Sequence, residues 1–160
     1  MIGSAVPRST GPSNASTSAL LAAGKAGVKE FHITGGLNPR IPFEYYEEMI
    51  RTLKRIVPTA TVKAFTSVEI DFFSKKFRIP VPEVFGRLKA AGMDCMPGGG
   101  AEILADRVRQ IICPEKLTGQ QWIELQRQAH QNRMPTNATM LYGHVETWEE
   151  RIDHMLAIRS

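Results

Sequence analysis

Apolar and polar positions follow two alternating periods along the chain from Ala19 onward. Short runs rich in β-branched and aromatic residues predict strands over 28–34, 61–69, 93–96 and 135–142. Longer runs with an apolar residue every three or four positions predict helices over 43–57, 82–91 and 101–112. Two further helices are predicted after the capping boxes Thr118/Gln121 and Thr147/Glu150. This alternation indicates βαβ units and a parallel sheet, either doubly wound or part of a β/α barrel.

Several residues mark where the predicted helices begin and end. Pro42 lies near the first turn of the helix 43–57, and Pro58 stops that helix. Gly92 is expected to end the helix 82–91 in a left-handed conformation. We expect Met140 and Trp148 to belong to the core.

The composition indicates a single soluble domain. The chain has 160 residues, of which 42% are apolar and 22% charged, as in ordinary globular domains. Residues 1–18 contain little that can be buried, so we expect them to be disordered and 19–160 to form the domain. No apolar run approaches the roughly 18 residues of a membrane span, and no secretory h-region is present. We therefore expect a cytoplasmic protein without a membrane partner.

Charge and cysteine usage narrow the function classes. The net charge is +4, but basic residues are mostly interleaved with acidic ones, so no nucleic-acid partner is expected. The two cysteines, Cys95 and Cys113, are too few for a disulfide scaffold and too far apart for a structural zinc or iron-sulfur site. We interpret both as buried, reduced thiols and predict no metal ligands.

Polar side chains recur on one face of the first two predicted strands. Glu30, His32 and Thr34 lie opposite Phe31 and Ile33 on the first strand. On the second strand, the face that includes Lys63, Ser67 and Glu69 lies opposite Val62, Ala64 and Val68. Burying such groups is costly unless a partner or ligand engages them, so this face predicts a ligand chamber. The alternatives are a Glu30–Lys63 ion pair that only fills the interior, and a His32 that is merely a core residue.

Two glycine turns follow predicted strands. Gly35 and Gly36 end the first strand, and the run 98–100 ends the third, just before a predicted helix. Glycine lets backbone amides approach a ligand closely, and such amides can hold a carboxylate or phosphate. An ordinary tight turn is the alternative for each loop alone, whereas two loops at one sheet edge favour a ligand cleft. In the last strand, the pattern leaves open whether Asn137 and Thr139 or Thr136 and Met140 face inward.

Four motifs carry a family resemblance, and they are KEFHITGGLNP, KAFTSVEIDFF, AAGMDCMPGGGAEI and TNATMLYGHVET. In this order they resemble the aminofutalosine synthases, radical S-adenosylmethionine enzymes of the futalosine route to menaquinone. Cyclic dehypoxanthinyl futalosine synthases and deazaflavin-forming synthases share the architecture. The stretches PGGGAEI and ATMLYGH are more similar to the aminofutalosine branch. The resemblance covers residues from about 20 to 160.

The resemblance implies a fold, a reaction and site residues. The fold would be a fragment of a partial (β/α)6 barrel, here with about four parallel strands and outer helices. In the family, a 4Fe-4S cluster cleaves S-adenosylmethionine, the 5'-deoxyadenosyl radical adds to the small-molecule substrate 3-[(1-carboxyvinyl)oxy]benzoate, and loss of the carboxyl group as bicarbonate gives aminodeoxyfutalosine. Gly35 and Gly36 match the glycine motif that binds the methionine amino group, and Glu69 matches a position near the cofactor. The strand-face argument adds the substrate-lining residues Glu30, His32, Thr34, Lys63, Ser67, Asn137 and Thr139.

The sequence departs from the family in one chemical respect. No CxxxCxxC motif is present, and Cys95 and Cys113 cannot supply three cluster thiolates. We therefore expect a fragment of such an enzyme that is inactive alone, and we expect unpaired strand edges to promote self-association, with the oligomeric state left open. Two alternatives are a fragment of a sibling radical enzyme and a metal-free module that holds a nucleoside or carboxylate.

Overall fold

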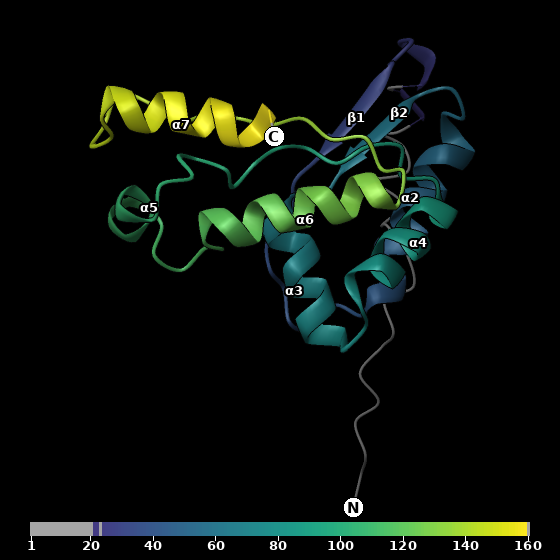
Figure 1. Cartoon of the computed structure of the whole chain (residues 1–160). Helices are drawn as coiled ribbons and strands as arrows, with labels where there is room; N and C mark the ends of the chain where they lie inside the picture. Colours follow the sequence, from purple (N-terminus) through teal and green to yellow (C-terminus); the bar gives the residue numbers. More distant parts are fainter. Residues whose placement is uncertain (1–20, 23, 160) are drawn as a thin grey trace, which may run out of the picture.

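The computed structural model describes residues 21–22 and 24–159, so the predicted disordered segment 1–18 lies outside the described residues. Within them, two parallel strands pair, β1 (Glu30–Ile33) with β2 (Thr61–Ala64). The helices are α2 (Phe43–Ile56), α3 (Ser67–Phe77), α4 (Val81–Ala91), α5 (Asp106–Ile112), α6 (Gly119–Gln131) and α7 (Trp148–Arg159). The helices α2, α3, α4 and α6 gather beside the small sheet (Figure 1). The predicted α/β class is confirmed.

The third and fourth predicted strands are present only as bridged segments. Cys95 pairs with Lys63 in parallel, and Met96 pairs with Thr136, but neither segment extends into a strand. Pro97 and Pro135 lack the N–H group that a ladder needs, and the run 98–100 is glycine, which has little strand preference. The described residues therefore form two strands and two bridged segments, and not a four-stranded barrel.

The predicted strand 61–69 is wrong in its second half. β2 ends at Ala64, and α3 begins at Ser67. Between them Phe65 adopts a left-handed conformation, with φ of 58°, that turns the chain out of the sheet. The sequence from Thr66 to Glu69 has the Ser/Thr-x-x-Glu pattern of a helix start, a signal that the strand prediction overlooked.

The other helix predictions differ in accuracy. α2 and α4 lie where they were predicted, and Gly92 ends α4 with φ of 112°. The capping boxes before α6 and α7 are also confirmed by hydrogen bonds in both directions. The helix predicted over 101–112 is shorter, because α5 begins only at Asp106.

The core lies between the sheet and α2, α3 and α4. Phe43, Tyr46, Phe65 and Phe73 form an aromatic cluster in which three rings pack against Phe73, with centroid separations of 5.5, 4.5 and 5.1 Å. Burying each such ring contributes about 2–3 kcal/mol. The core thus fixes one face of the sheet, and the other face carries the polar positions.

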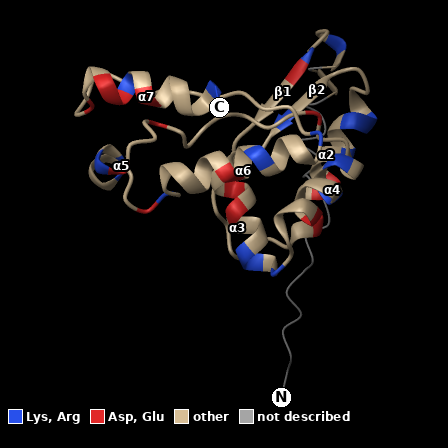
Figure 2. Cartoon of the chain, in the orientation of Figure 1, with Lys and Arg blue, Asp and Glu red and all other residues tan. Residues whose placement is uncertain are grey.

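Charged residues pair across helices, and one predicted core residue lies at the surface. Basic and acidic positions are interspersed along the helices (Figure 2), and Arg87 of α4 pairs with Glu44 and Glu47 of α2. Trp148 of α7 is 72% exposed, so its predicted core position is wrong, while Met140 is half-buried. No helix within 21–22 and 24–159 is long and apolar enough to cross a membrane.

Candidate functional site

Glu69, in the first turn of α3, connects the chain segments that follow β1 and β2. One carboxylate oxygen of Glu69 accepts a hydrogen bond from the backbone N–H of Gly35 at 2.8 Å. The other oxygen accepts from the backbone N–H and the hydroxyl of Thr66, at 2.8 and 2.9 Å. Glu69 is buried, so these bonds are shielded from water. The carboxylate therefore holds the first glycine turn against the N-terminus of α3.

The three-glycine turn packs against the same helix end. A Cβ atom added to Gly99 would lie 2.9 Å from the Thr66 methyl group. One added to Gly100, which has φ of 84°, would lie 2.9 Å from a methyl group of Val68. Only glycine permits this approach. Both glycine turns therefore lie at one end of the sheet, around residues 66–69.

Arg109 of α5 holds the backbone that follows the three-glycine turn. Its guanidinium donates to the carbonyl oxygens of Gly100, Ala101 and Leu117, at 3.1, 2.6 and 2.7 Å. The Arg109 side chain is fully buried, and carbonyl oxygens satisfy its donors in place of a carboxylate. The residues after the turn give their carbonyls to Arg109 instead of to a helix, which explains the late start of α5.

Glu30, His32 and Lys63 lie together on the sheet face away from the core. His32 pairs with Lys63 across the strands, and Lys63 pairs with Cys95, so the three form a lateral row whose side chains share a face. The Lys63 ammonium lies 3.3 Å from the Glu30 carboxylate. Glu30 and His32 are exposed, and Lys63 is half-buried. The expectation that these polar side chains are buried, and therefore need a ligand to offset the cost of burial, is wrong.

Cys95 is a member of this polar row that the sequence interpretation missed. It is half-buried, and burial raises the pKa of its thiol. The missed signal is its position, since alternation along the segment 93–96 places Cys95 opposite the buried Met96.

The remaining predicted site residues do not join the polar row. Ser67 is buried in α3, and its hydroxyl accepts a hydrogen bond from the Gln126 amide at 2.9 Å. Because the chain leaves the sheet at Phe65, strand alternation no longer applies to Ser67 or Glu69. Thr34 follows β1 and is exposed.

The two predicted residues of the last segment also lie apart from each other. The Thr139 hydroxyl donates to the Gly98 carbonyl at 2.8 Å, so it supports the three-glycine turn. Asn137 lines a cleft of about 340 Å³ between α6 and α7. The segment is not a regular strand, and its side chains therefore follow separate contacts instead of one inward face.

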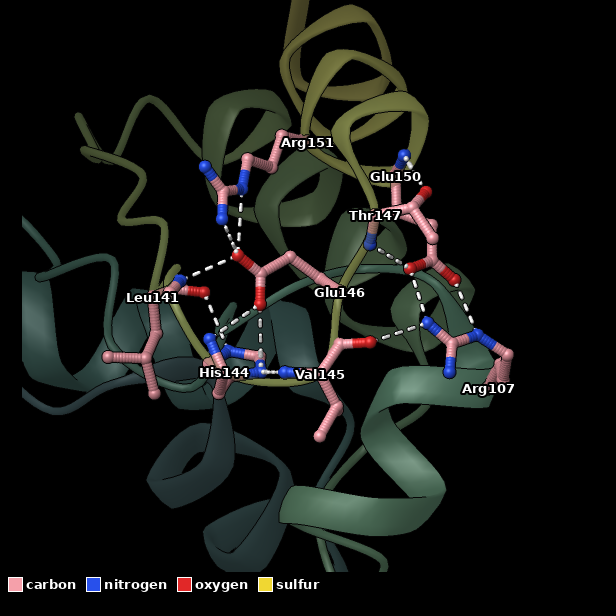
Figure 3. Close-up of polar contacts among 9 residues, drawn as sticks. Arg107, Leu141, His144, Val145, Glu146, Thr147, Glu150 and Arg151 are labelled. Atoms are coloured by element: carbon pink, nitrogen blue, oxygen red, sulfur yellow. Dashed lines mark hydrogen bonds and ion pairs between the residues drawn. The ribbon is translucent and has the colours of Figure 1, made fainter.

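Residues 141–147 form a tightly bonded loop (Figure 3), although they belong to a motif of the family resemblance to which the sequence analysis gave no structural role. The Glu146 carboxylate accepts from the backbone N–H groups of Gly143 and His144, at 2.6 and 2.9 Å, and from the Arg151 guanidinium at 2.7 Å. These donors, the Gly143 N–H first, lower the pKa of Glu146 to about 2. Arg107 of α5 pairs with Glu150 of α7 and anchors the other side of the loop.

The residues present do not fit an iron-sulfur cluster. A cluster needs three or four thiolates, whereas the chain has two cysteines, one in the polar row and one buried after α5. In the part of the chain that the structure describes, no group of three His, Cys, Asp or Glu residues is placed to hold a metal ion.

Glycine turns gathered at one end of parallel strands are the arrangement in which open α/β sheets commonly bind ligands. Residues 17–158 match the family model of the radical SAM superfamily, and the chain belongs to this superfamily.

Three curated proteins are similar to this chain over most of its length. The chain is 53% identical over 133 residues to aminodeoxyfutalosine synthase of Thermus thermophilus, covering 83% of this chain and 36% of that protein. It is 50% identical over 136 residues to 5-amino-6-(D-ribitylamino)uracil–L-tyrosine 4-hydroxyphenyl transferase 1 of Methanosarcina acetivorans, covering 85% and 36%. The corresponding transferase of Methanococcoides burtonii is 43% identical over 134 residues, covering 84% and 38%. The chain thus spans little more than a third of the length of these relatives.

Proposed function

We propose that this chain is part of a radical SAM enzyme that forms aminodeoxyfutalosine from S-adenosylmethionine and 3-[(1-carboxyvinyl)oxy]benzoate in menaquinone biosynthesis. The observation that carries the proposal is the 53% identity to aminodeoxyfutalosine synthase over 83% of the chain. A cytoplasmic location and a small-molecule substrate are part of the proposal. Membership in the superfamily implies S-adenosylmethionine and a 4Fe-4S cluster in the parent enzyme. Because this chain lacks the thiolates, the cluster would be held elsewhere in that enzyme.

The glycine edge is the proposed cofactor side of the site. A Cβ atom added to Gly36 would meet nothing within 4 Å, so its backbone is open to a ligand. The Gly35 N–H is already bonded to Glu69. We therefore assign Gly36 and the turn itself to contact with the methionine part of the cofactor, and we assign Glu69 to positioning that turn.

The polar row is the proposed substrate side. Lys63 carries a positive charge beside His32, and the substrate has two carboxylates, so a charge-assisted hydrogen bond would orient it. Glu30 holds the Lys63 ammonium in place at 3.3 Å. Thr34 directly follows the strand that carries His32. Ser67, Asn137 and Thr139 would act less directly, Ser67 through Gln126 and Thr139 through the Gly98 carbonyl.

A chimeric enzyme tests this proposal. Residues 19–160 replace their counterpart in the Thermus thermophilus synthase, which supplies the rest of the protein. After anaerobic reconstitution, we expect mass spectrometry to detect aminodeoxyfutalosine from carboxyvinyloxybenzoate. The Lys63→Met chimera should have a KM raised about tenfold or more, which is about 1.4 kcal/mol of lost binding. An exposed control, Lys76→Met, should match the unsubstituted chimera. No aminodeoxyfutalosine from a cluster-loaded chimera would contradict the proposal.

A second candidate is the hydroxyphenyl transfer reaction of the deazaflavin type. It is favoured by the 50% identity to the Methanosarcina acetivorans transferase, which is only slightly lower than the identity to the synthase. The same chimera offered 5-amino-6-(D-ribitylamino)uracil and L-tyrosine separates the two reactions. A third, non-catalytic role as a nucleoside-binding module predicts tight binding of S-adenosylmethionine to this chain alone, which calorimetry measures directly.

A further inference from the structure

Tyr46 of α2 has a buried hydroxyl group that the described arrangement leaves unused. The residue is buried, and among the residues that the structure describes no group forms a hydrogen bond with its hydroxyl oxygen. A buried hydroxyl without a partner has lost its bonds to water and gained none in return, so it is costly and uncommon in folded proteins. The Tyr46 hydroxyl is therefore a donor that a neighbouring acceptor can use if the site rearranges.

The ring of Tyr46 lies against the helix face that carries Glu69. Its centroid is 4.5 Å from that of Phe73 and 5.6 Å from that of Phe65, the residue before the capping box of α3. Phe73 follows Glu69 by four residues, so the two share one face of α3 and lie one turn apart. Burial first, and then the charge of Glu69, raise the pKa of the Tyr46 hydroxyl. The hydroxyl is therefore close enough to the Glu69 carboxylate to be influenced by its charge.

The two oxygens of the Glu69 carboxylate differ in how many donors they have. Oε2 accepts two hydrogen bonds from Thr66, at 2.8 and 2.9 Å. Within the described part of the chain, Oε1 accepts one, from the N–H of Gly35 at 2.8 Å. A ligand that took the Gly35 N–H would leave a buried, charged oxygen without a donor, which costs more than losing a bond between neutral groups. The Gly35 N–H is thus available to a ligand only if another donor replaces it at Oε1.

We propose that Tyr46 is a positioning residue that supplies this replacement donor. When a carboxylate or another acceptor of a ligand binds the Gly35 N–H, Oε1 of Glu69 accepts instead from the Tyr46 hydroxyl. The number of hydrogen bonds to Glu69 is then unchanged, and the buried hydroxyl acquires its partner. This inference rests on the proposed function only in placing the ligand, S-adenosylmethionine, at the glycine edge, and it holds for either candidate reaction.

Amide hydrogen exchange in this chain alone tests the change of donors. Opening of the Gly35–Glu69 bond is helped by the replacement donor, so Tyr46→Phe should slow exchange at Gly35 about tenfold without lowering the free energy of unfolding. A hydroxyl with only a structural role would have the opposite effect. The Val62 N–H, which donates to the Asp94 carboxylate at 2.7 Å, is the internal reference, and Tyr45→Phe is the matched control. Exchange at Gly35 that is unchanged or faster in Tyr46→Phe overturns the proposal.

The chimeric enzyme tests the link to the ligand. After reconstitution, Tyr46→Phe should weaken binding of S-adenosylmethionine about tenfold in equilibrium dialysis, and Tyr45→Phe should not. In a Glu69→Ala chimera, Tyr46→Phe should have no further effect, because the carboxylate that needs the donor is gone. An affinity that Tyr46→Phe leaves unchanged overturns the proposal. A chimera that shows these affinities but forms no aminodeoxyfutalosine supports the role of Tyr46 and contradicts only the proposed reaction.

Discussion

Glu69 offers the sharpest test of how the glycine edge is built. Its carboxylate accepts from the N–H of Gly35, and from the N–H and hydroxyl of Thr66. Loss of a helix cap costs about 1 kcal/mol, and a hydrogen bond to a charged group contributes about 1.5–3 kcal/mol. We therefore expect Glu69→Ala to lower the free energy of unfolding by about 3 kcal/mol. Glu69→Gln keeps one acceptor and should cost about half as much.

Two measurements check the Glu69 prediction together. Urea unfolding followed by tryptophan fluorescence gives the free energy, and amide hydrogen exchange reports on Gly35. Exchange at Gly35 should accelerate at least tenfold in Glu69→Ala, since its acceptor is gone. Glu115→Gln, an exposed carboxylate change, serves as the control and should alter neither value. An unchanged Gly35 exchange rate in a folded Glu69→Ala chain would show that the bond does not hold the turn.

Two further predictions address the glycine turns and the docking of α7. A Cβ atom on Gly98 would lie 2.0 Å from a backbone carbonyl oxygen, so Gly98→Ala should destabilise by about 3 kcal/mol, whereas Gly36→Ala should change stability by less than about 0.5 kcal/mol. Equal melting temperatures would refute this contrast. Burial lowers the pKa of His154 below its ordinary value of 6.5, so its contribution to stability is present above that pH and is lost as the pH falls through the folded-state pKa. Exchange at the Leu104 amide, corrected for intrinsic rate, should therefore rise on acidification, and a flat profile would contradict the prediction.

Local sequence patterns predicted most of the helices correctly. The faces of the site residues were predicted less well, because a turn at Phe65 ends the second strand early. The periodicity of α2 and the glycine after α4 are local signals, so both helices were predicted correctly. Residues 61–69 carried two signals at once, a β-rich run and a helix start at Thr66. The left-handed conformation of Phe65 ends the strand between them. Strand alternation cannot detect such a residue, so the predicted faces were wrong beyond Ala64.

Long-range contacts were beyond the reach of sequence patterns. The burial of Arg109 among backbone carbonyls depends on a loop that no periodicity describes. The outward stripe of α7 has the spacing of a core helix, and the spacing alone does not show that Trp148 and Ile152 are exposed. The hydrogen bond between Gly35 and Glu69 joins two motifs that the family resemblance had singled out, although the two residues lie 34 positions apart.

The two sides of the candidate site differ in what holds them. Bonds to Glu69 and close packing of Gly99 on Thr66 meet within residues 66–69, so the glycine edge is well held although the sheet has two strands in the part of the chain that the structure describes. The polar row has only the Glu30–Lys63 pair on an open face, and an exposed ion pair contributes at most about 1 kcal/mol. The side chains of the row are therefore less firmly held than the glycine edge. The proposed cofactor side is thus preorganised in this chain, whereas the proposed substrate side is held by one ion pair on an exposed face.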